Sequence, residues 1–313
     1  MQFASSQKGV ALITALLIVA LATVISVEIS KHLQLDIRRT GNLIASDQAL
    51  LYMMTAESWS RRILRDDRQD NNYDHLDEGW ATEIPPIPVE GGTISGKLTD
   101  LQGCFNLNSL LANGQPNVAA QQIFTRLMQR LAMPTGTNLS QSVIDWLDDD
   151  LNTHTPDGAE DNYYLNLEKP YHSANSLIYS VSELRLIKGF EDDDIIQQTR
   201  DWLCAFGPAA NMQINVNTAP AEVIESLAAN MSAATVTQII DQRKEDPYET
   251  PQEFVNRHNL ASIITDTSLI TVSSEYFLLE TEARIGQAVT LMYSIIHRED
   301  DGSTQVLARS QGA

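Results

Sequence analysis

The densest group of side chains with metal-binding chemistry lies between residues 145 and 161. Carboxylates crowded into one short segment repel each other unless water solvates them or a cation bridges them, and hard oxygen ligands suit Ca²⁺. The segment therefore predicts a calcium site, with a merely solvated acidic loop as the alternative. The oxygen-bearing side chains belong to Asp145, Asp148, Asp149, Asp150, Asn152, Asp157, Glu160 and Asp161.

Part of this segment follows the EF-hand pattern and then departs from it. Asp148, Asp150 and Asn152 occupy the first three ligand positions of such a loop. Thr153, however, stands at the position that requires glycine, and Glu160 comes one residue too late for the closing bidentate ligand. The sequence therefore excludes an EF-hand and favours a calcium loop of another shape.

Gly158 is expected to supply the tight bend of that loop. His154 and His172 are close in sequence, but we expect both at the surface, since a hard ion prefers oxygen ligands. A second acidic run, at residues 191–194, is explained more simply as the first turn of a helix, whose positive dipole end favours carboxylates. The ligands that we expect for Ca²⁺ are Asp148, Asp150, Glu160 and Asp161.

Sequence motifs for other chemistry are weak. Residues 91–97 read GGTISGK and match most of a phosphate-binding loop, but Leu98 replaces the Ser or Thr that binds magnesium. The six histidines form no HExxH pair, and no GxSxG motif occurs. A membrane-tethered hydrolase that used the acidic segment would need an open coordination position on its metal, which no motif indicates. We therefore expect a protein without enzymatic activity.

Residues 10–27 read VALITALLIVALATVISV and contain no charged side chain. This length is near the minimum, roughly 17 residues, with which a helix crosses the hydrocarbon core of a bilayer. A secretory signal peptide would have a shorter apolar region followed by a small-x-small cleavage site. Lys8 stands just before the segment, so the positive-inside rule places the N-terminus in the cytoplasm and the rest of the chain outside.

Charge and cysteine content fit an exported protein without a nucleic-acid partner. The chain has 41 acidic and 21 basic residues among 313, a formal net charge of -20, which repels nucleic-acid phosphates. Its two cysteines, Cys104 and Cys204, allow one disulfide in an oxidising compartment or two thiols in a reducing one. Export favours the disulfide, because free thiols are a liability outside the cytoplasm.

The helical pattern continues without a proline from the apolar segment to residue 62. Along its second part, residues at spacings of three, four or seven fall on one face of the helix. We interpret this stripe as a packing face for neighbouring helices, with packing onto the chain's own sheet as the alternative. The stripe consists of Leu33, Ile37, Thr40, Ile44, Leu51 and Met54.

Beyond the helix the pattern changes twice. Residues 63–104 begin as a polar, charged loop and continue as short strands broken by prolines. Residues 105–262 carry helical periodicity, and residues 263–313 return to alternating β-branched and aromatic residues. The tripeptides at 106–108 and 215–217 suggest either helix capping or two related helix-hairpin-helix units. This order predicts an α+β fold, in which an all-α domain interrupts a unit made of a long helix and an antiparallel sheet.

A leader with Lys8 and Gly9 directly before an apolar helix resembles that of type IV prepilins. In that family a prepilin peptidase cuts after the glycine, so the resemblance implies that residues 1–9 are removed and Val10 becomes the mature N-terminus. Most pilins carry glutamate at the fifth mature position, where this chain has Thr14. The resemblance associates that difference with a capping position in a filament. An uncleaved signal anchor is the alternative.

Four further segments carry a resemblance that spans nearly the whole chain. They are LQGCFNLNSL at 101–110, DWLDDDLNTHTPDGAEDNYYL at 145–165, SVSELRLIKGF at 180–190 and INVNTAPAEVIESL at 214–227. In this order and spacing they resemble the minor pseudopilin K family of type II secretion. That resemblance implies a pilin-like sheet and helix with a large inserted helical domain, and it supports Ca²⁺ in the helical domain.

The resemblance also implies a place and partners. It predicts a single-pass protein of the inner membrane, in contact with its lipid, with most of the chain in the periplasm. It implies a subunit that starts or caps the pseudopilus together with minor pseudopilins I and J, and with H. A type IV pilus-related adhesin or DNA-uptake subunit is the alternative.

Overall fold

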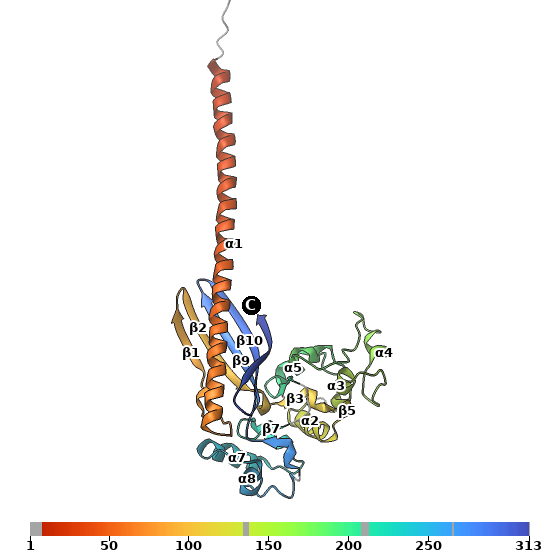
Figure 1. The fold of residues 1–313 in the computed structure, drawn as a ribbon. Helices are drawn as coiled ribbons and strands as arrows, with labels where there is room; N and C mark the ends of the chain where they lie inside the picture. The colour runs from red at the N-terminus through yellow and green to blue at the C-terminus, as the bar shows by residue number, and fades with distance from the viewer. Residues whose placement is uncertain (1–7, 134–137, 208–212, 265, 313) are drawn as a thin grey trace, which may run out of the picture.

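The computed structural model describes residues 8–133, 138–207, 213–264 and 266–312. A long helix and a five-stranded sheet form one lobe of the molecule (Figure 1). A second lobe, made of shorter helices, adjoins one end of that sheet and is called the helical lobe below. The long helix and the antiparallel sheet with additional helices confirm the predicted fold class. The helices are α1 (Lys8–Asp70), α2 (Val118–Arg130), α3 (Leu139–Leu147), α4 (Asp161–Tyr164), α5 (Asp193–Thr199), α6 (Ala221–Ser226), α7 (Ala233–Glu245) and α8 (Pro251–Arg257).

Helix α1 is one uninterrupted element of 63 residues, or about 95 Å at 1.5 Å per residue. It runs past residue 62, where we expected it to end, and stops at Asp70, before the polar loop that follows. Among the described residues, α1 alone is long and apolar enough to cross a membrane. Its first half stands free of the rest of the molecule (Figure 1).

All five strands of the main sheet pair antiparallel, in the order β1-β2-β9-β10-β11. The turn between the first two strands needs glycine, because Gly91 has a φ of +84° and a Cβ on Gly92 would lie 1.7 Å from the carbonyl oxygen of Arg284. The strands are β1 (Ile84–Val89), β2 (Gly92–Asp100), β9 (Tyr276–Ile285), β10 (Ala288–Arg298) and β11 (Thr304–Gly312).

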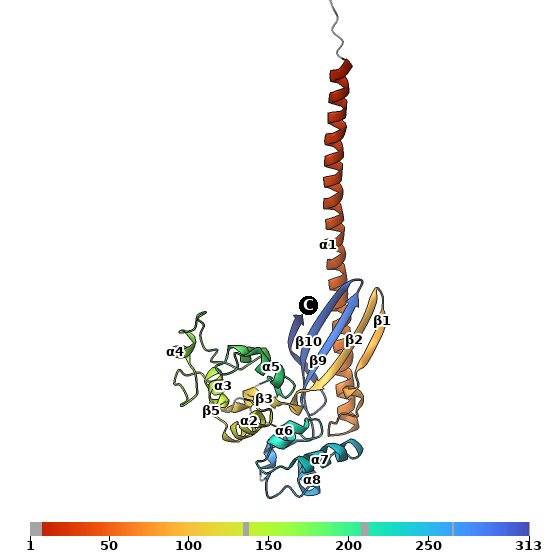
Figure 2. The same ribbon diagram turned by 180° about the vertical axis from the view of Figure 1, so that it is seen from behind.

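The second half of α1 packs across one face of this sheet (Figures 1 and 2). Ala49 and Met53 contact a core near the top of the sheet that includes Ala283, while Leu64 packs with Phe277 lower down. Between these two apolar contacts the buried side of the helix is polar, because Glu57 accepts hydrogen bonds from Ser294 and Arg309 of the sheet. The helix and the sheet therefore form one unit.

The expected stripe does not lie on this packed side. Leu33, Ile37, Ile44 and Leu51 are 58%, 63%, 62% and 65% exposed, whereas Ala49 is fully buried. At 100° per residue, the stripe faces away from the sheet. Packing onto the chain's own sheet is therefore excluded as the explanation of the stripe.

The helical lobe has one continuous core built from α2 to α8 and the loops between them. We expected the C-terminal strands from residue 263, but Ile264, Ile270 and Val272 pack in the core of this lobe. The reason is that β8 pairs in parallel with β7, so the main sheet resumes only at Tyr276. The short strands here are β3 (Phe105–Asn106), β4 (Leu111–Ala112), β5 (Gln115–Pro116), β6 (Leu203–Cys204), β7 (Ile214–Asn215) and β8 (Ile270–Thr271).

A disulfide and a buried polar network join the two lobes. Cys104 and Cys204 are bonded, with Cα atoms 5.9 Å apart, so the predicted disulfide is present. Asp100, buried at the end of β2, accepts hydrogen bonds from Asn215, Thr218 and Ser274. Burial raises the pKa of Asp100 to about 6. These contacts attach the helical lobe to the sheet at several points.

Candidate metal centre

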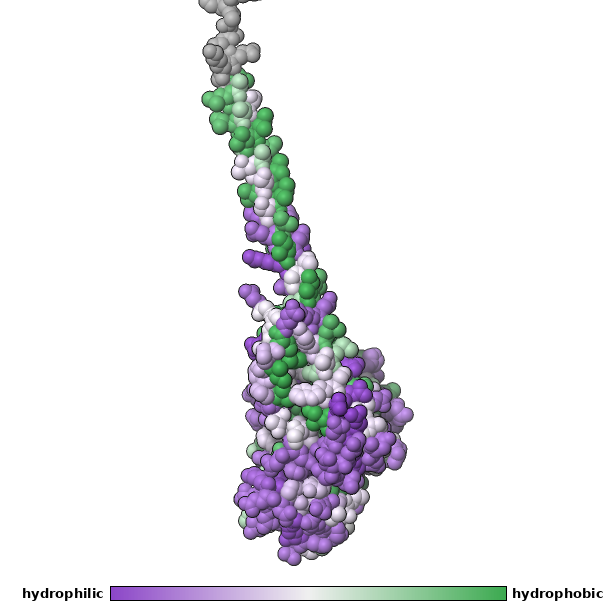
Figure 3. Space-filling model, turned by 60° about the vertical axis from the view of Figure 1, so that its left-hand side comes forward, coloured by the Kyte–Doolittle hydropathy of each residue, from purple (hydrophilic) through white to green (hydrophobic). Residues whose placement is uncertain are grey.

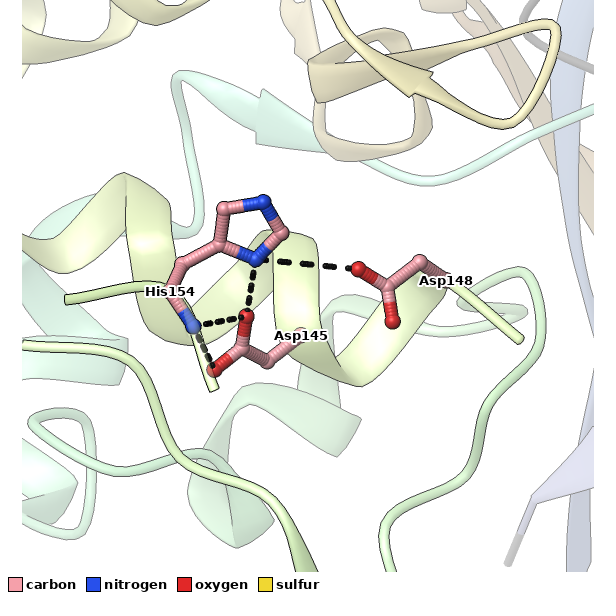
Figure 4. A group of neighbouring side chains, drawn as sticks. All are labelled: Asp145, Asp148 and His154. Carbon is pink, nitrogen blue, oxygen red and sulfur yellow. Dashed lines mark hydrogen bonds and ion pairs between the residues drawn. The ribbon is translucent and has the colours of Figure 1, made fainter. Parts of the chain in front are cut away.

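The candidate metal centre is built around the C-terminal end of α3. This helix places Asp145 inside the lobe, fully buried, and ends at Leu147, followed by the capping residue Asp148, which is 6% exposed. The loop that follows brings His154 back, so that its Nδ1 lies 2.5 Å from Asp145 Oδ1 and 3.7 Å from Asp148 Oδ2 (Figure 4). The ligand atoms of these three residues lie within 4.8 Å of one another.

Gly158 lets the loop close on the helix. A Cβ at this position would lie 2.2 Å from Asp145 Oδ2 and 2.4 Å from the carbonyl oxygen of His154. The sequence suggested glycine for a bend here, and the structure adds that only glycine fits against the carboxylate. The loop is tied further to α3 because Asp157 Oδ2 accepts a 2.7 Å hydrogen bond from the backbone N–H of Asn138.

The site holds more acceptor oxygens than protein donors. Six buried polar side-chain atoms lack a partner among the described residues, and four of them are acceptor oxygens from this segment and its neighbour Asn175. These are Asp148 Oδ1, both carboxylate oxygens of Glu160, and Asn175 Oδ1. Buried acceptors of this kind are costly without a partner, so the group fits a bound cation.

The carboxylates of the site hinder one another's ionisation. Burial, with the charges of Asp145 and Asp148, raises the pKa of Glu160 to about 8. Burial, with the charge of Asp150, raises the pKa of Asp148 to about 6. Burial also raises the pKa of Asp145, against the opposing hydrogen bond from His154. A divalent cation between these groups would reverse the effect and favour their charged forms.

The four expected ligands occupy different environments. Asp148 and Glu160 are buried and lack protein donors on one or more oxygens. Asp150 Oδ1 accepts from the backbone N–H of Asn152, and Asp161 accepts from Ser173 and pairs with His172 at 2.8 Å. His172 lies at the surface, as expected, but His154 is within the group.

Sequence reasoning missed Asn175 altogether and did not choose Asp145 as a ligand. Asn175 follows the acidic segment by many residues and returns to it with its Nδ2 donating to the carbonyl oxygen of Asp150. Its φ of +44°, a conformation that asparagine tolerates better than most residues, was not visible in the sequence. Asp145 lies on the buried side of α3, close to Asp148. Residues three apart on a helix lie on the same face, so the sequence was compatible with this placement but could not show that the face is buried.

Two other acidic groups are satisfied by protein partners. Asp67, Asp74 and Glu78 converge where α1 ends, but Arg298 donates to Asp74 at 2.6 Å and to Asp67 at 2.9 Å. In the run at 191–194, the side chain of Asp192 caps α5 by accepting from the backbone N–H of Asp194. This is the helix-start role expected from the sequence.

A long, partly apolar first helix, an antiparallel sheet on its second half and an inserted helical lobe define a pilin-type subunit with an enlarged head. Residues 103–208 and 214–273 each match a family described as Type II secretion system (T2SS), protein K. This chain belongs to that family, whose members are structural components of a protein-secretion system.

Relatives match over almost the full length. Type II secretion system protein K of Pseudomonas aeruginosa is 32% identical over 98% of this chain and 93% of its own. The protein of the same description from Aeromonas hydrophila is 29% identical over 98% of this chain and 97% of its own.

A solved structure also matches. It is the crystal structure of the GspK-GspI-GspJ complex from the type 2 secretion system of enterotoxigenic Escherichia coli. The matching chain superimposes with a TM-score of 0.78 at 29% identity, over 88% of this chain and 99% of that chain. The agreement supports a minor pseudopilin, the general role that the sequence predicted.

Proposed function

We propose that this chain is the tip subunit of the type II secretion pseudopilus, where it starts or caps assembly with minor pseudopilins I, J and H. The observation that carries the proposal is the position of the helical lobe. It lies beside and beyond the end of the sheet, on the side opposite the membrane-spanning segment (Figures 1 and 2). A subunit stacked beyond this head would collide with it, because the joint between the lobes holds the lobe in place.

Thr14 also supports a position at the tip of the pseudopilus. Its hydroxyl bonds within its own helix, to the carbonyl oxygens of Val10 at 3.1 Å and Ala11 at 3.0 Å. A glutamate here would place a carboxylate in lipid and require a partner from the next subunit. A subunit with threonine needs no such partner, which fits the end of a filament.

We propose further that prepilin peptidase cuts after Gly9, leaving Val10 as the mature end of α1. Residues 10–27 would then anchor the protein in the inner membrane, with the head in the periplasm. Of the leader, residues 1–7 lie outside the described part of the chain. Leu33, Ile37, Ile44 and Leu51 would face neighbouring helices in the assembly, because no part of this head covers them.

Co-isolation from membranes tests the assembly role. The full chain, produced with pseudopilins I and J, should be recovered in complex with both. Ile44→Asp places a charge in the stripe and should weaken recovery at least tenfold, while Asn42→Asp, which adds the same charge at an exposed position on the opposite side of the same helix, should have no effect. Unchanged recovery of the Ile44→Asp variant would contradict the proposed packing face.

We propose that the acidic site binds Ca²⁺. Asp148 and Glu160 supply unpartnered, buried carboxylate oxygens, and Asn175 supplies an amide oxygen, a donor set that suits this ion. Asp145 would complete the site once its contact with His154 opens. The charges of Asp150 and Asp161 also act on Glu160, so both carboxylates would add to the attraction for a cation. The bound ion would join the end of α3 to the loop and stabilise this part of the lobe.

Thermal unfolding tests the calcium proposal. A ligand that binds only the folded state raises the melting temperature with its concentration, by about 2.7 kcal/mol of stability at 100 times its Kd. The full chain in detergent should therefore melt at higher temperature with Ca²⁺ than with a chelator. Glu160→Gln should remove most of this difference, whereas Glu225→Gln, distant in sequence on α6, should retain it. Identical melting curves with and without Ca²⁺ would contradict the proposal.

A further inference from the structure

An apolar slot of about 190 Å³ opens between α1 and the hairpin of β1 and β2. Trp59 and Ala56 form its helix side, and Ile84, Ile87 and Ile94 form much of its strand side. An engineered apolar cavity of about 150 Å³ holds a benzene ring, so this slot has room for one aromatic side chain. Apolar surface gathers along α1 and continues onto this part of the head (Figure 3).

Ser60 lines the same slot and supplies a hydroxyl group that has no hydrogen-bond partner in the described part of the chain. The residue is fully buried. Nearby hydroxyls on α1 behave differently, because Thr55 and Ser58 each donate to the carbonyl oxygen four residues earlier. A buried hydroxyl that does not bond back to its helix calls for a partner, and the open slot is where one would enter.

Lipid does not account for this apolar surface. Trp59 is 48% exposed and Ile87 is 39% exposed. Yet Trp59 follows the end of the membrane segment by about 48 Å of helix, at 1.5 Å per residue. A half-exposed tryptophan this far from the bilayer faces water unless another protein covers it.

Strand addition does not account for it either. β1 is an edge strand with three prolines in the sequence IPPIPV. Proline lacks the backbone N–H that a new strand would need, and its presence at an edge blocks such pairing. Recognition at this place must therefore use side chains.

The slot is continuous with the exposed stripe. Leu51, Thr55 and Trp59 follow one another at four-residue spacing, so a chain that covers the stripe reaches the mouth of the slot. A second pilin-type subunit, anchored in the same membrane by its own first helix, would run alongside α1 and present side chains at this height.

We propose that the slot receives one large apolar side chain with a hydrogen-bonding tip, such as tyrosine or tryptophan, from the neighbouring pseudopilin that packs along α1. The ring fills the space between α1 and the β1–β2 hairpin, and its polar tip bonds to Ser60 Oγ. This inference rests on the proposed function, since it requires a neighbour on the stripe.

Photo-cross-linking in cells tests the slot. The photoreactive residue p-benzoylphenylalanine replaces Trp59, or Ile44 in the stripe, or Tyr179, which is 74% exposed on the helical lobe. Positions 59 and 44 should both form an adduct with a co-produced minor pseudopilin, and position 179 should not. An adduct at 44 alone would overturn the slot and leave the assembly role intact. The absence of an adduct at both positions would contradict the slot proposal and the assembly role together. An adduct at position 59 with a second copy of this chain would contradict the slot proposal.

Matched variants then test the chemistry inside the slot. Ser60→Ala should weaken recovery of the neighbour by about three- to tenfold, the effect of losing one hydrogen bond, while Ser58→Ala should leave it unchanged. Ala56→Leu fills the slot and should weaken recovery at least tenfold. Thermal unfolding of each variant alone should match the unmodified chain. Recovery unaffected by both Ser60→Ala and Ala56→Leu would overturn the proposal.

Discussion

Removing the disulfide should loosen the attachment of the helical lobe to the sheet. Cys104 follows the end of β2 and Cys204 lies in β6, so the bond closes a loop with a sequence separation of 100 residues. In the chain-entropy account, a loop of this length contributes about 4.7 kcal/mol by restricting the unfolded chain, and native disulfides typically contribute about 2–5 kcal/mol. We expect the double variant Cys104→Ala/Cys204→Ala to lose stability in that range.

Urea unfolding followed by tryptophan fluorescence measures the loss, because Trp146 and Trp202 lie in the helical lobe. The sulfur atoms also pack near Leu101 and Phe206, so the alanine variant loses packing as well as the cross-link. The reduced unmodified chain keeps both sulfurs and should lose nearly as much stability as the variant. A difference below about 1 kcal/mol between oxidised and reduced protein would refute the reasoning.

Three further outcomes are expected. Gly158→Ala forces a Cβ against Asp145 and should abolish the rise in melting temperature with Ca²⁺, whereas Gly79→Ala, whose Cβ meets no atom within 4 Å, should preserve it. Ionisation of Asp100, with its pKa raised to about 6 against an ordinary value of 3.8, destabilises the folded state progressively as pH rises from about 4 to 6. Asp100→Asn should therefore remove up to about 3 kcal/mol of this pH dependence, measured by urea unfolding across that window. Arg298→Met leaves Asp74 buried without its cation and should destabilise the chain by about 3–5 kcal/mol in the same assay, an effect that Arg284→Met, on an exposed part of β9, should not reproduce.

The long helix and the order of helical and strand regions along the chain were predictable, because they depend on local patterns of residues. The uncharged run at 10–27 and the absence of proline up to residue 62 determine α1 without knowledge of any distant contact. The end of α1 and the return to the sheet were placed less accurately. Both depend on tertiary contacts, since Arg298 binds the end of α1 and β8 pairs with β7 in the helical lobe.

The acidic segment was recognisable from the sequence, but its geometry was not. Carboxylates at 145–161 indicate a cation because charge density is a local property of the chain. Which of them face one another depends on how the loop folds back on α3, so the contact of His154 with Asp145 could not be foreseen. The slot at Ser60 is likewise invisible in the sequence, because it forms between α1 and a hairpin more than twenty residues later.

The position of this chain in the filament is the central claim, and immunogold labelling of pseudopili tests it most directly. An antibody against a peptide tag inserted at the exposed turn of Asn113 and Gly114, in the helical lobe, should mark one end of each filament. The same tag on a major pseudopilin should mark the shaft along its length. Gold particles from the tagged lobe distributed along the shaft would contradict the tip position.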